Sequence, residues 1–260
     1  MMTVAEVREL LRNADEREFA SIERSLVADQ RKGVVQALET ARRRIAADRA
    51  ERERLESLYR FESAFLPGGE GTIVGLDEVG RGAVAGPLAV GAVVLSHDDK
   101  IAGLNDSKQI SPERREEIAR EIQERCIFWV VEYVSPKDID RDGISASLKR
   151  AFSGALEKVK SNAICPDVVL VDGNPLHIDE REVNVVKGDA KCASIAAASI
   201  VAKVQRDALM RELSRKYPDY GFDINKGYGS PQHIEAIRAH GLSEIHRESF
   251  CRSFMQETLF

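Results

Sequence analysis

Hydrophobic and polar residues follow two different patterns along this 260-residue chain. Up to residue 64 the chain is highly charged, contains no proline, and places apolar residues such as Val7 and Leu11 three or four positions apart. Residues at that spacing share one face of a helix, so the pattern predicts a helical N-terminal extension over 1–64, with two or three helices and a break near Gly33. Residues 65–71, rich in glycine and with one proline, predict a linker.

From residue 72 onward, short apolar runs alternate with stretches of helical spacing. Strands are expected where β-branched and apolar residues run together, at 72–79, 88–96, 126–134, 167–172 and 182–187. Helices are expected at 112–124, at 145–160, at 191–216 and from Ser230-Pro231, a favoured N-cap followed by proline. This order predicts an α/β domain over 72–260, with a mixed sheet flanked by helices.

Two carboxylates interrupt the first apolar strand at its end. Asp77-Glu78 follows a buried run and precedes Gly80-Arg81-Gly82. Burying a charge costs several kcal/mol unless it is paired or binds a metal, and hard cations such as Mg²⁺ and Mn²⁺ prefer carboxylate oxygens. The alternative is a solvated strand end followed by an ordinary glycine turn.

Two further acids favour the metal site. Asp172 closes the apolar run 167–173, and Asp189 lies just before the long helix. Sites in open α/β sheets gather outside the strand ends, so these acids and Asp77-Glu78 are expected to converge. Two divalent ions roughly 3.5–4 Å apart would then activate water and stabilise charge in phosphodiester hydrolysis.

Six segments of the chain resemble bacterial type II ribonuclease H in their order and spacing. They are GLDEVGRGAVAGPLAVGAVVL (75–95), NDSKQIS (105–111), VLVDG (169–173), KGDAKCASIAAASIVAKVQRD (187–207), KGYGS (226–230) and GLSEIHRESF (241–250). The resemblance implies the ribonuclease H fold, with a five-stranded mixed sheet and added C-terminal helices. It also implies an endonuclease that hydrolyses the RNA strand of RNA/DNA hybrids, including single ribonucleotides embedded in duplex DNA. The products would carry 3′-hydroxyl and 5′-phosphate ends, and the role would be removal of RNA primers and misincorporated ribonucleotides.

The same resemblance assigns the site residues. Asp77, Glu78, Asp172 and Asp189 would be catalytic and would bind Mn²⁺ or Mg²⁺. Gly80, Arg81 and Gly82 would recognise the 2′-hydroxyl, Tyr228 would stack on the adjacent deoxyribose, and Asn105, Ser107 and Lys108 would lie near the nucleic acid. Physically, peptides flanked by glycine can approach a ligand closely, and the 2′-hydroxyl is what distinguishes RNA from DNA. Without the resemblance, Tyr228 would be a half-buried aromatic and 105–108 a plain loop.

Other polar residues keep two interpretations each. Lys187, Lys191, Lys203 and Arg206 would line a phosphate track or form a solvated face. His246 would pair with a phosphate or the edge of the metal site, or would be structural. Ser194 and Ser199 are expected to allow close packing of a helix on the sheet.

Composition adds context. The net charge of −5 requires any basic surface to be local, and Arg42, Arg43 and Arg44 of the extension would dock on the hybrid or form a solvated helix face. The four cysteines are scattered and are expected to be free thiols. No secretory signal or membrane-spanning run is visible, so a cytoplasmic location is expected. The protein is also expected to be a monomer.

Three other functions remain open. A dinucleotide-binding module would also place glycines after a strand, although the spacing at 80, 82 and 86 has one residue too many. A metal nuclease acting on DNA alone would not need the Gly80-Arg81-Gly82 loop or Tyr228. A protein that only binds hybrids would not need all four acids.

Overall fold

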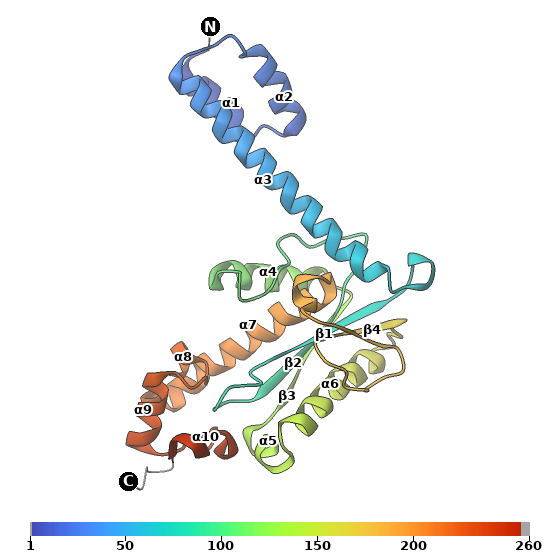
Figure 1. The fold of residues 1–260 in the computed structure, drawn as a ribbon, viewed down its shortest axis with the longest axis vertical. Helices are drawn as coiled ribbons and strands as arrows, with labels where there is room; N and C mark the ends of the chain where they lie inside the picture. Colours follow the sequence, from blue (N-terminus) through green and yellow to red (C-terminus); the bar gives the residue numbers. More distant parts are fainter. Residues whose placement is uncertain (1, 256–260) are drawn as a thin grey trace. The chain divides into compact units, whose positions relative to one another are not determined.

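The structure is a computed structural model that describes residues 2–255. The chain divides into two compact units, the first ending at Glu56 and the second beginning at Ser57. The first unit contains α1 (Val4–Arg12), α2 (Glu16–Ser25) and most of α3 (Lys32–Ser63) (Figure 1). The break between helices precedes Gly33, which lies in the first turn of α3. Thr3 and Asp15 form capping boxes that begin α1 and α2, so these short helices satisfy their free N–H groups locally.

The second unit is built on a five-stranded mixed sheet, as predicted. Its strands are β1 (Ile73–Val79), β2 (Leu88–Val94), β3 (Phe128–Val134), β4 (Val168–Asp172) and β5 (Glu182–Val185), in the order β3-β2-β1-β4-β5. Strand β1 pairs antiparallel with β2 and parallel with β4. Leu76 lies opposite Val171, so Asp77 and Asp172 occupy the next position of two adjacent parallel strands.

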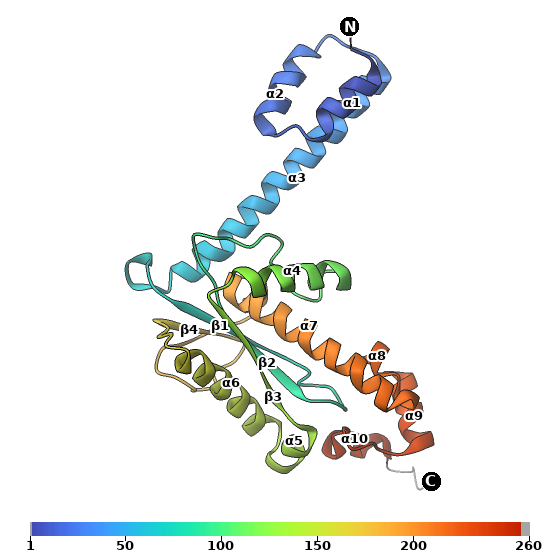
Figure 2. The same cartoon turned by 180° about the vertical axis from the view of Figure 1, so that it is seen from behind.

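Helices cover both faces of this sheet (Figures 1 and 2). Val74 and Leu76 of β1 pack with α6 (Ile144–Ser161), whereas Ile73 packs with α7 (Ala193–Lys216), because successive strand residues point to opposite faces. Helix α7 lies very close to the sheet, since a Cβ at Gly75 would stand 2.2 Å from the backbone of Ser194. The predicted close packing of this Ser/Ala-rich helix therefore occurs.

The remaining helices lie around the sheet and its two covering helices. They are α4 (Pro112–Arg125), α5 (Pro136–Asp142), α8 (Phe222–Asn225), α9 (Pro231–His240) and α10 (Glu248–Met255). The C-terminal helices share a core around Tyr220 and Phe222 that includes Val84 and Ala85 of the β1–β2 connection. This core joins the C-terminal segment to the loop that follows Asp77-Glu78. Within the described residues, no helix is both long and apolar enough to cross a membrane.

Candidate active site

A cavity of about 480 Å³ opens beside the ends of β1 and β4. It brings together all the predicted site residues except Asn105. Its lining consists of Asp77, Glu78, Val79, Gly80, Arg81, Gly82, Ser107, Lys108, Asp172, Asp189, Ser199, Lys203 and Tyr228. Segments far apart in the sequence thus contribute acidic, glycine-rich and aromatic groups to a single place.

Three different elements position the carboxylates. Asp77 and Asp172 come from adjacent strands, and Asp189 lies on the short 3₁₀ helix η2 (Gly188–Ala190). The N–H of Gly188 donates to Asp172 Oδ1 at 2.6 Å, which holds η2 against the end of β4. Asp77 is buried and accepts a hydrogen bond from the hydroxyl of Ser199 on α7. The sheet and α7 therefore fix the two innermost acids.

Asp77, Glu78 and Asp189 all have raised pKa values. Burial raises the pKa of Asp77 well above its ordinary value, and the charges of Glu78 and Asp172 raise it further. Burial also raises the pKa of Glu78, with Arg81 acting in the opposite direction. The pKa of Asp189 is raised by burial and by neighbouring acids, including Asp172. A bound cation would reverse these shifts, because it favours the ionised carboxylates.

The donor set fits a hard divalent cation in its chemistry. Carboxylate oxygens from β1, β4 and η2 line one cavity, and such oxygens are the preferred ligands of Mg²⁺ and Mn²⁺. Among residues 2–255, however, no three Asp, Glu, His or Cys side chains stand close enough to hold an ion as they are arranged. Binding therefore requires the carboxylates to rotate toward a common point.

The two glycines of the Gly80-Arg81-Gly82 loop serve different purposes. Gly80 has φ of 84°, and a Cβ there would lie 2.2 Å from Nε of Arg206, so the fold itself demands glycine. A Cβ on Gly82 would meet nothing within 4 Å. Nothing inside the described protein explains glycine at this second position. Arg81 is exposed and lies 3.5 Å from Glu78.

Tyr228 presents its ring at the edge of the cavity. Its exposed fraction is 39%, and the guanidinium of Arg206 lies 5.6 Å from the ring centre. Nδ1 of His233 lies 2.9 Å from the carbonyl oxygen of Tyr228. Neighbouring side chains thus support the ring and its backbone while leaving part of the ring accessible.

The loop 105–108 contributes two of its three predicted residues. Ser107 and Lys108 line the cavity, and Oγ of the buried Ser107 lies 3.1 Å from Oγ of Ser199. Asn105 does not line it, and its side-chain oxygen accepts a hydrogen bond from the N–H of Asp106 instead.

One interpretation from the sequence needs correction. Arg206 belongs neither to a phosphate track nor to a solvated face, because it is fully buried and donates to backbone carbonyls. His246 contacts His233, with 3.0 Å between their Nε2 atoms, so its structural interpretation holds.

Of the three lysines predicted for a phosphate track, Lys203 does line the cavity and pairs with Asp207 at 2.8 Å. Lys187 and Lys191 are exposed and are not among the residues that line this cavity.

Sequence reasoning missed two residues near the cavity. Ser199 was assigned to helix packing, yet it also hydrogen-bonds Asp77. Arg247 was not singled out, although it donates to the carbonyl of Arg81. The resembling segments 187–207 and 241–250 contain both residues, but nothing in the local pattern shows what they contact.

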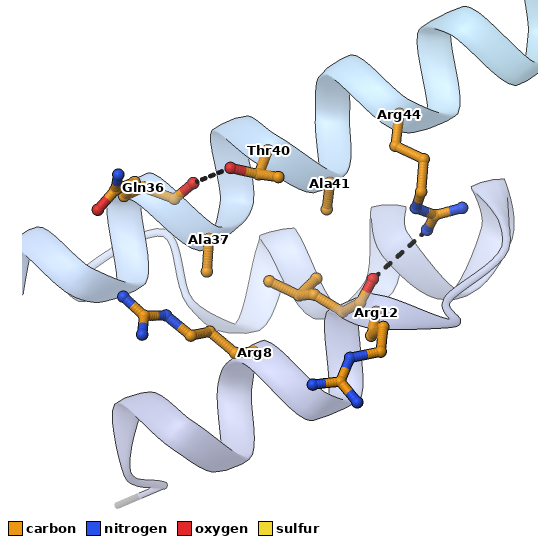
Figure 3. Close-up of a pocket in the computed structure, with 8 residues that line it drawn as sticks. Arg8, Arg12, Gln36, Ala37, Thr40, Ala41 and Arg44 are labelled. Carbon is orange, nitrogen blue, oxygen red and sulfur yellow. Dashed lines mark hydrogen bonds between the residues drawn. The ribbon is translucent and has the colours of Figure 1, made fainter.

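A second cavity, of about 410 Å³, lies in the first unit between α1 and α3 (Figure 3). Its lining includes no acid and consists of Arg8, Arg12, Arg44, the polar Gln36 and Thr40, and the apolar Leu11, Ala37 and Ala41. Arg44 also donates to the carbonyl oxygens of Leu11 and Ala14. This cavity has no carboxylate in its lining and three arginines that would repel a cation, so the candidate active site is the one in the second unit.

The mixed sheet in the order β3-β2-β1-β4-β5, with acids at the ends of β1 and β4, defines a hydrolase of the ribonuclease H class. The family model for Ribonuclease HII matches residues 74–253, and that for the Ribonuclease HII N-terminal domain matches residues 3–66. The chain belongs to the ribonuclease HII family. It is therefore an endonucleolytic ribonuclease H that acts on RNA/DNA hybrids, and the dinucleotide-binding interpretation is excluded.

Individual relatives agree with this assignment. Ribonuclease HII of Bacillus cereus (strain AH820) is 42% identical over 225 residues, which is 86% of each chain. The structure of the PCNA:RNase HII complex from Archaeoglobus fulgidus contains a chain with 32% identity and a TM-score of 0.61, covering 72% of this chain and 98% of that one. The crystal structure of Bst-RNase HIII in complex with Mn²⁺ has 24% identity and a TM-score of 0.57, covering 71% and 69%, and supports the fold alone.

Proposed function

We propose that this ribonuclease H cuts single ribonucleotides embedded in duplex DNA as well as longer RNA/DNA hybrids, by a mechanism that uses two divalent ions. The observation that carries the proposal is the cavity itself, where four carboxylates line the same space as Gly80–Gly82 and Tyr228. Hydrolysis would leave 3′-hydroxyl and 5′-phosphate ends. Removal of RNA primers and misincorporated ribonucleotides would follow from this specificity.

Asp77, Glu78, Asp172 and Asp189 would hold the ions, which are Mn²⁺ or Mg²⁺. When bound, such ions activate the attacking water and stabilise charge on the phosphoryl oxygens. Asp77 and Asp172 come from adjacent positions at the ends of β1 and β4 and both line the cavity, so rotation of their side chains would let both reach one ion. Either ion fits this donor set, because both take oxygen ligands.

Recognition of RNA would fall to the loop Gly80-Arg81-Gly82 and to Tyr228. The open space at Gly82 lets a ribose approach the peptide groups, and the exposed part of the Tyr228 ring offers a stacking surface. Ser107, Lys108 and Lys203 would face the phosphates from the other side of the cavity. Asn105 would act only through the conformation of its loop.

We further place this activity in the cytoplasm, where bacterial duplex DNA lies, and assign it to a monomer. The monomer assignment rests on the fact that one chain supplies every residue of the cavity. The complex with PCNA is that of the relative from Archaeoglobus fulgidus.

The decisive experiment compares a labelled DNA duplex carrying one ribonucleotide with an all-DNA duplex of the same sequence. Each is incubated with Mn²⁺, with Mg²⁺ and with chelator. The expected result is metal-dependent incision on the 5′ side of the ribonucleotide alone. Equal cutting of both duplexes would overturn the RNA specificity, and cutting in chelator would overturn the metal site.

A further inference from the structure

Two buried arginines lie behind the cavity. Arg206 of α7 and Arg247, the residue before α10, are both fully buried. Within residues 2–255, neither forms an ion pair with a carboxylate. Buried charges are normally paired, because desolvating an unpaired ion is costly. Their hydrogen bonds therefore indicate what offsets this cost.

All of these bonds go to backbone carbonyls of two loops. We call residues 80–87 the GRG loop and residues 226–230 the KGYGS loop. Arg206 donates to the carbonyls of Ala85 at 3.2 Å, Pro87 at 2.9 Å and Lys226 at 2.8 Å, and so joins both loops.

Arg247 binds the GRG loop from the other end. It donates to the carbonyl of Arg81 at 2.9 Å and, through two nitrogens, to that of Gly86 at 3.1 and 2.9 Å. The two loops also bond directly, since the N–H groups of Val84 and Ala85 donate to the carbonyl of Gly227 at 2.8 and 3.0 Å.

The arginines also bear on the electrostatics of the loops. Burial lowers the pKa of Arg206, and burial together with the charge of Arg206 lowers the pKa of Arg247 to about 9. Arg247 therefore stays charged at neutral pH. Its positive charge, with no carboxylate paired to it, lies behind loops that would meet an anionic backbone.

We propose that Arg206 and Arg247 are positioning residues that set the spacing between the GRG loop and Tyr228, and so control selection for a 2′-hydroxyl. The inference rests on the proposed function of those loops. A substrate with one ribonucleotide offers a single 2′-hydroxyl, so its cleavage depends on this spacing. A long hybrid offers many 2′-hydroxyls and alternative registers, so its cleavage depends on the spacing less.

The test uses Arg247→Lys and Arg206→Lys, which keep the charge but lose the planar fork that holds several carbonyls at once. kcat and KM are measured on a duplex with one ribonucleotide and on a long hybrid. Displacement of a substrate-positioning group by about 1 Å can lower the rate on the order of 100-fold. We therefore expect kcat/KM to fall more for the duplex with one ribonucleotide than for the hybrid, so that the ratio of the two values falls at least about 10-fold. The control is Val159→Ala, a core change on α6. It lowers stability and should leave the ratio unchanged.

A double variant separates positioning from general damage. If Arg247 acts through Tyr228, then Arg247→Lys combined with Tyr228→Ala loses little more discrimination than Tyr228→Ala alone. Additive losses, or an equal loss on both substrates, would overturn the proposal. Should Arg247→Lys fail to fold, as judged by circular dichroism, Arg206→Lys carries the same comparison. Failure of the wild-type enzyme to prefer the ribonucleotide duplex over all-DNA would instead overturn the proposed function.

Discussion

Among single residues of the cavity, some are required by the fold, and others could be replaced without disturbing the fold. Gly80 is fixed by its left-handed backbone and by the nearness of Arg206, whereas Gly82 has open space where a side chain would stand. Asp77 differs from Gly82 because it is enclosed by the protein: it is buried and hydrogen-bonded, and its pKa is raised by burial and by neighbouring acids. Substitutions at Gly82 and Asp77 therefore test chemistry more directly than substitutions at Gly80.

Asp77→Asn should lower cleavage of hybrid by about 100-fold or more, because an amide is a poor ligand for a divalent ion. The fold should remain, since the amide keeps the size of the carboxyl and removes a buried charge. Activity with Mn²⁺ and the thermal midpoint are measured beside Glu117→Gln, an exposed acid on α4. Full activity in Asp77→Asn would contradict the metal assignment.

Gly82→Ala should leave stability within about 0.5 kcal/mol, since its Cβ meets no protein atom. The same methyl group would occupy the space assigned to the ribose, so cleavage of the single-ribonucleotide duplex should fall about 10-fold or more. Gly154→Ala, in α6 and outside the lining of the cavity, is the control and should leave cleavage unchanged. Unaltered kinetics in Gly82→Ala would remove this loop from substrate recognition.

At the scale of elements, helix α7 depends on a cap that its own sequence does not supply. Its N-cap residue Cys192 makes no side-chain cap bond. The fully buried Glu62, near the end of α3, accepts from both the N–H and the hydroxyl of Ser194 at 2.8 Å. Its other oxygen faces His97 Nε2 at 3.3 Å without the alignment of a hydrogen bond. A carboxylate at this helix terminus also complements the helix dipole.

Glu62→Ala should destabilise the second unit by about 1–3 kcal/mol, because the N–H of Ser194 then loses its buried partner. Glu62→Gln should cost less, since it keeps an acceptor. Urea unfolding followed by circular dichroism measures both, with exposed Glu53→Ala on the same helix as control. Equal midpoints for Glu62→Ala and Glu53→Ala would refute the capping role.

The buried pair His233 and His246 makes the stability of the folded protein depend on pH. Burial lowers the pKa of His233, and burial with the nearby His233 lowers that of His246 to about 4. The folded state therefore disfavours protonation of His246, and the stability present above about pH 6.5 is lost as the pH falls toward 4. The loss should reach about 2–3 kcal/mol.

The pH dependence is measured by urea unfolding at several pH values, for the wild type and for His246→Gln. The raised pKa values of Asp77, Glu78 and Asp189 act in the opposite direction, since their protonation stabilises the folded state as the pH falls. The difference between wild type and variant isolates the histidine. Parallel profiles for the two proteins would show that His246 does not contribute.

At the scale of the whole molecule, a chain of net charge −5 must bind a polyanion through local positive groups. In the first unit, Arg42 pairs with Glu23 and Arg44 donates to backbone carbonyls, so part of the arginine cluster is engaged within its own unit. In the second unit, Lys108 and Lys203 line the cavity directly. We expect the cavity lysines to dominate the salt dependence of binding.

The affinity for hybrid should fall as salt rises, and Lys108→Ala should reduce the slope of log K against log salt by about one. Binding is measured by fluorescence anisotropy in chelator, so that cleavage does not interfere. Lys149→Ala, an exposed residue on α6, serves as control. An unchanged slope for Lys108→Ala would mean that this side chain makes no phosphate contact.

The pattern of apolar residues was enough to predict the strands and most helices of the second unit, because their spacing reports which face of an element is buried. All five predicted strands are present, each up to two residues shorter than expected. Helix α5 was not predicted, since seven residues are too few for a clear helical period. The motif around Asp77 and Glu78, with its resemblance to the type II ribonucleases H, also led to the family.

The contacts between polar groups, in contrast, depend on how the whole chain folds. Periodicity shows that a residue of α7 faces inward but not what lies opposite, so the contact of Ser199 with Asp77 and the burial of Arg206 could not be predicted. The same limit applies to Arg247, whose partners lie more than 150 positions away along the chain. Strand order and the docking of C-terminal helices create these contacts, because long-range hydrogen bonds depend on the complete fold and not on local spacing.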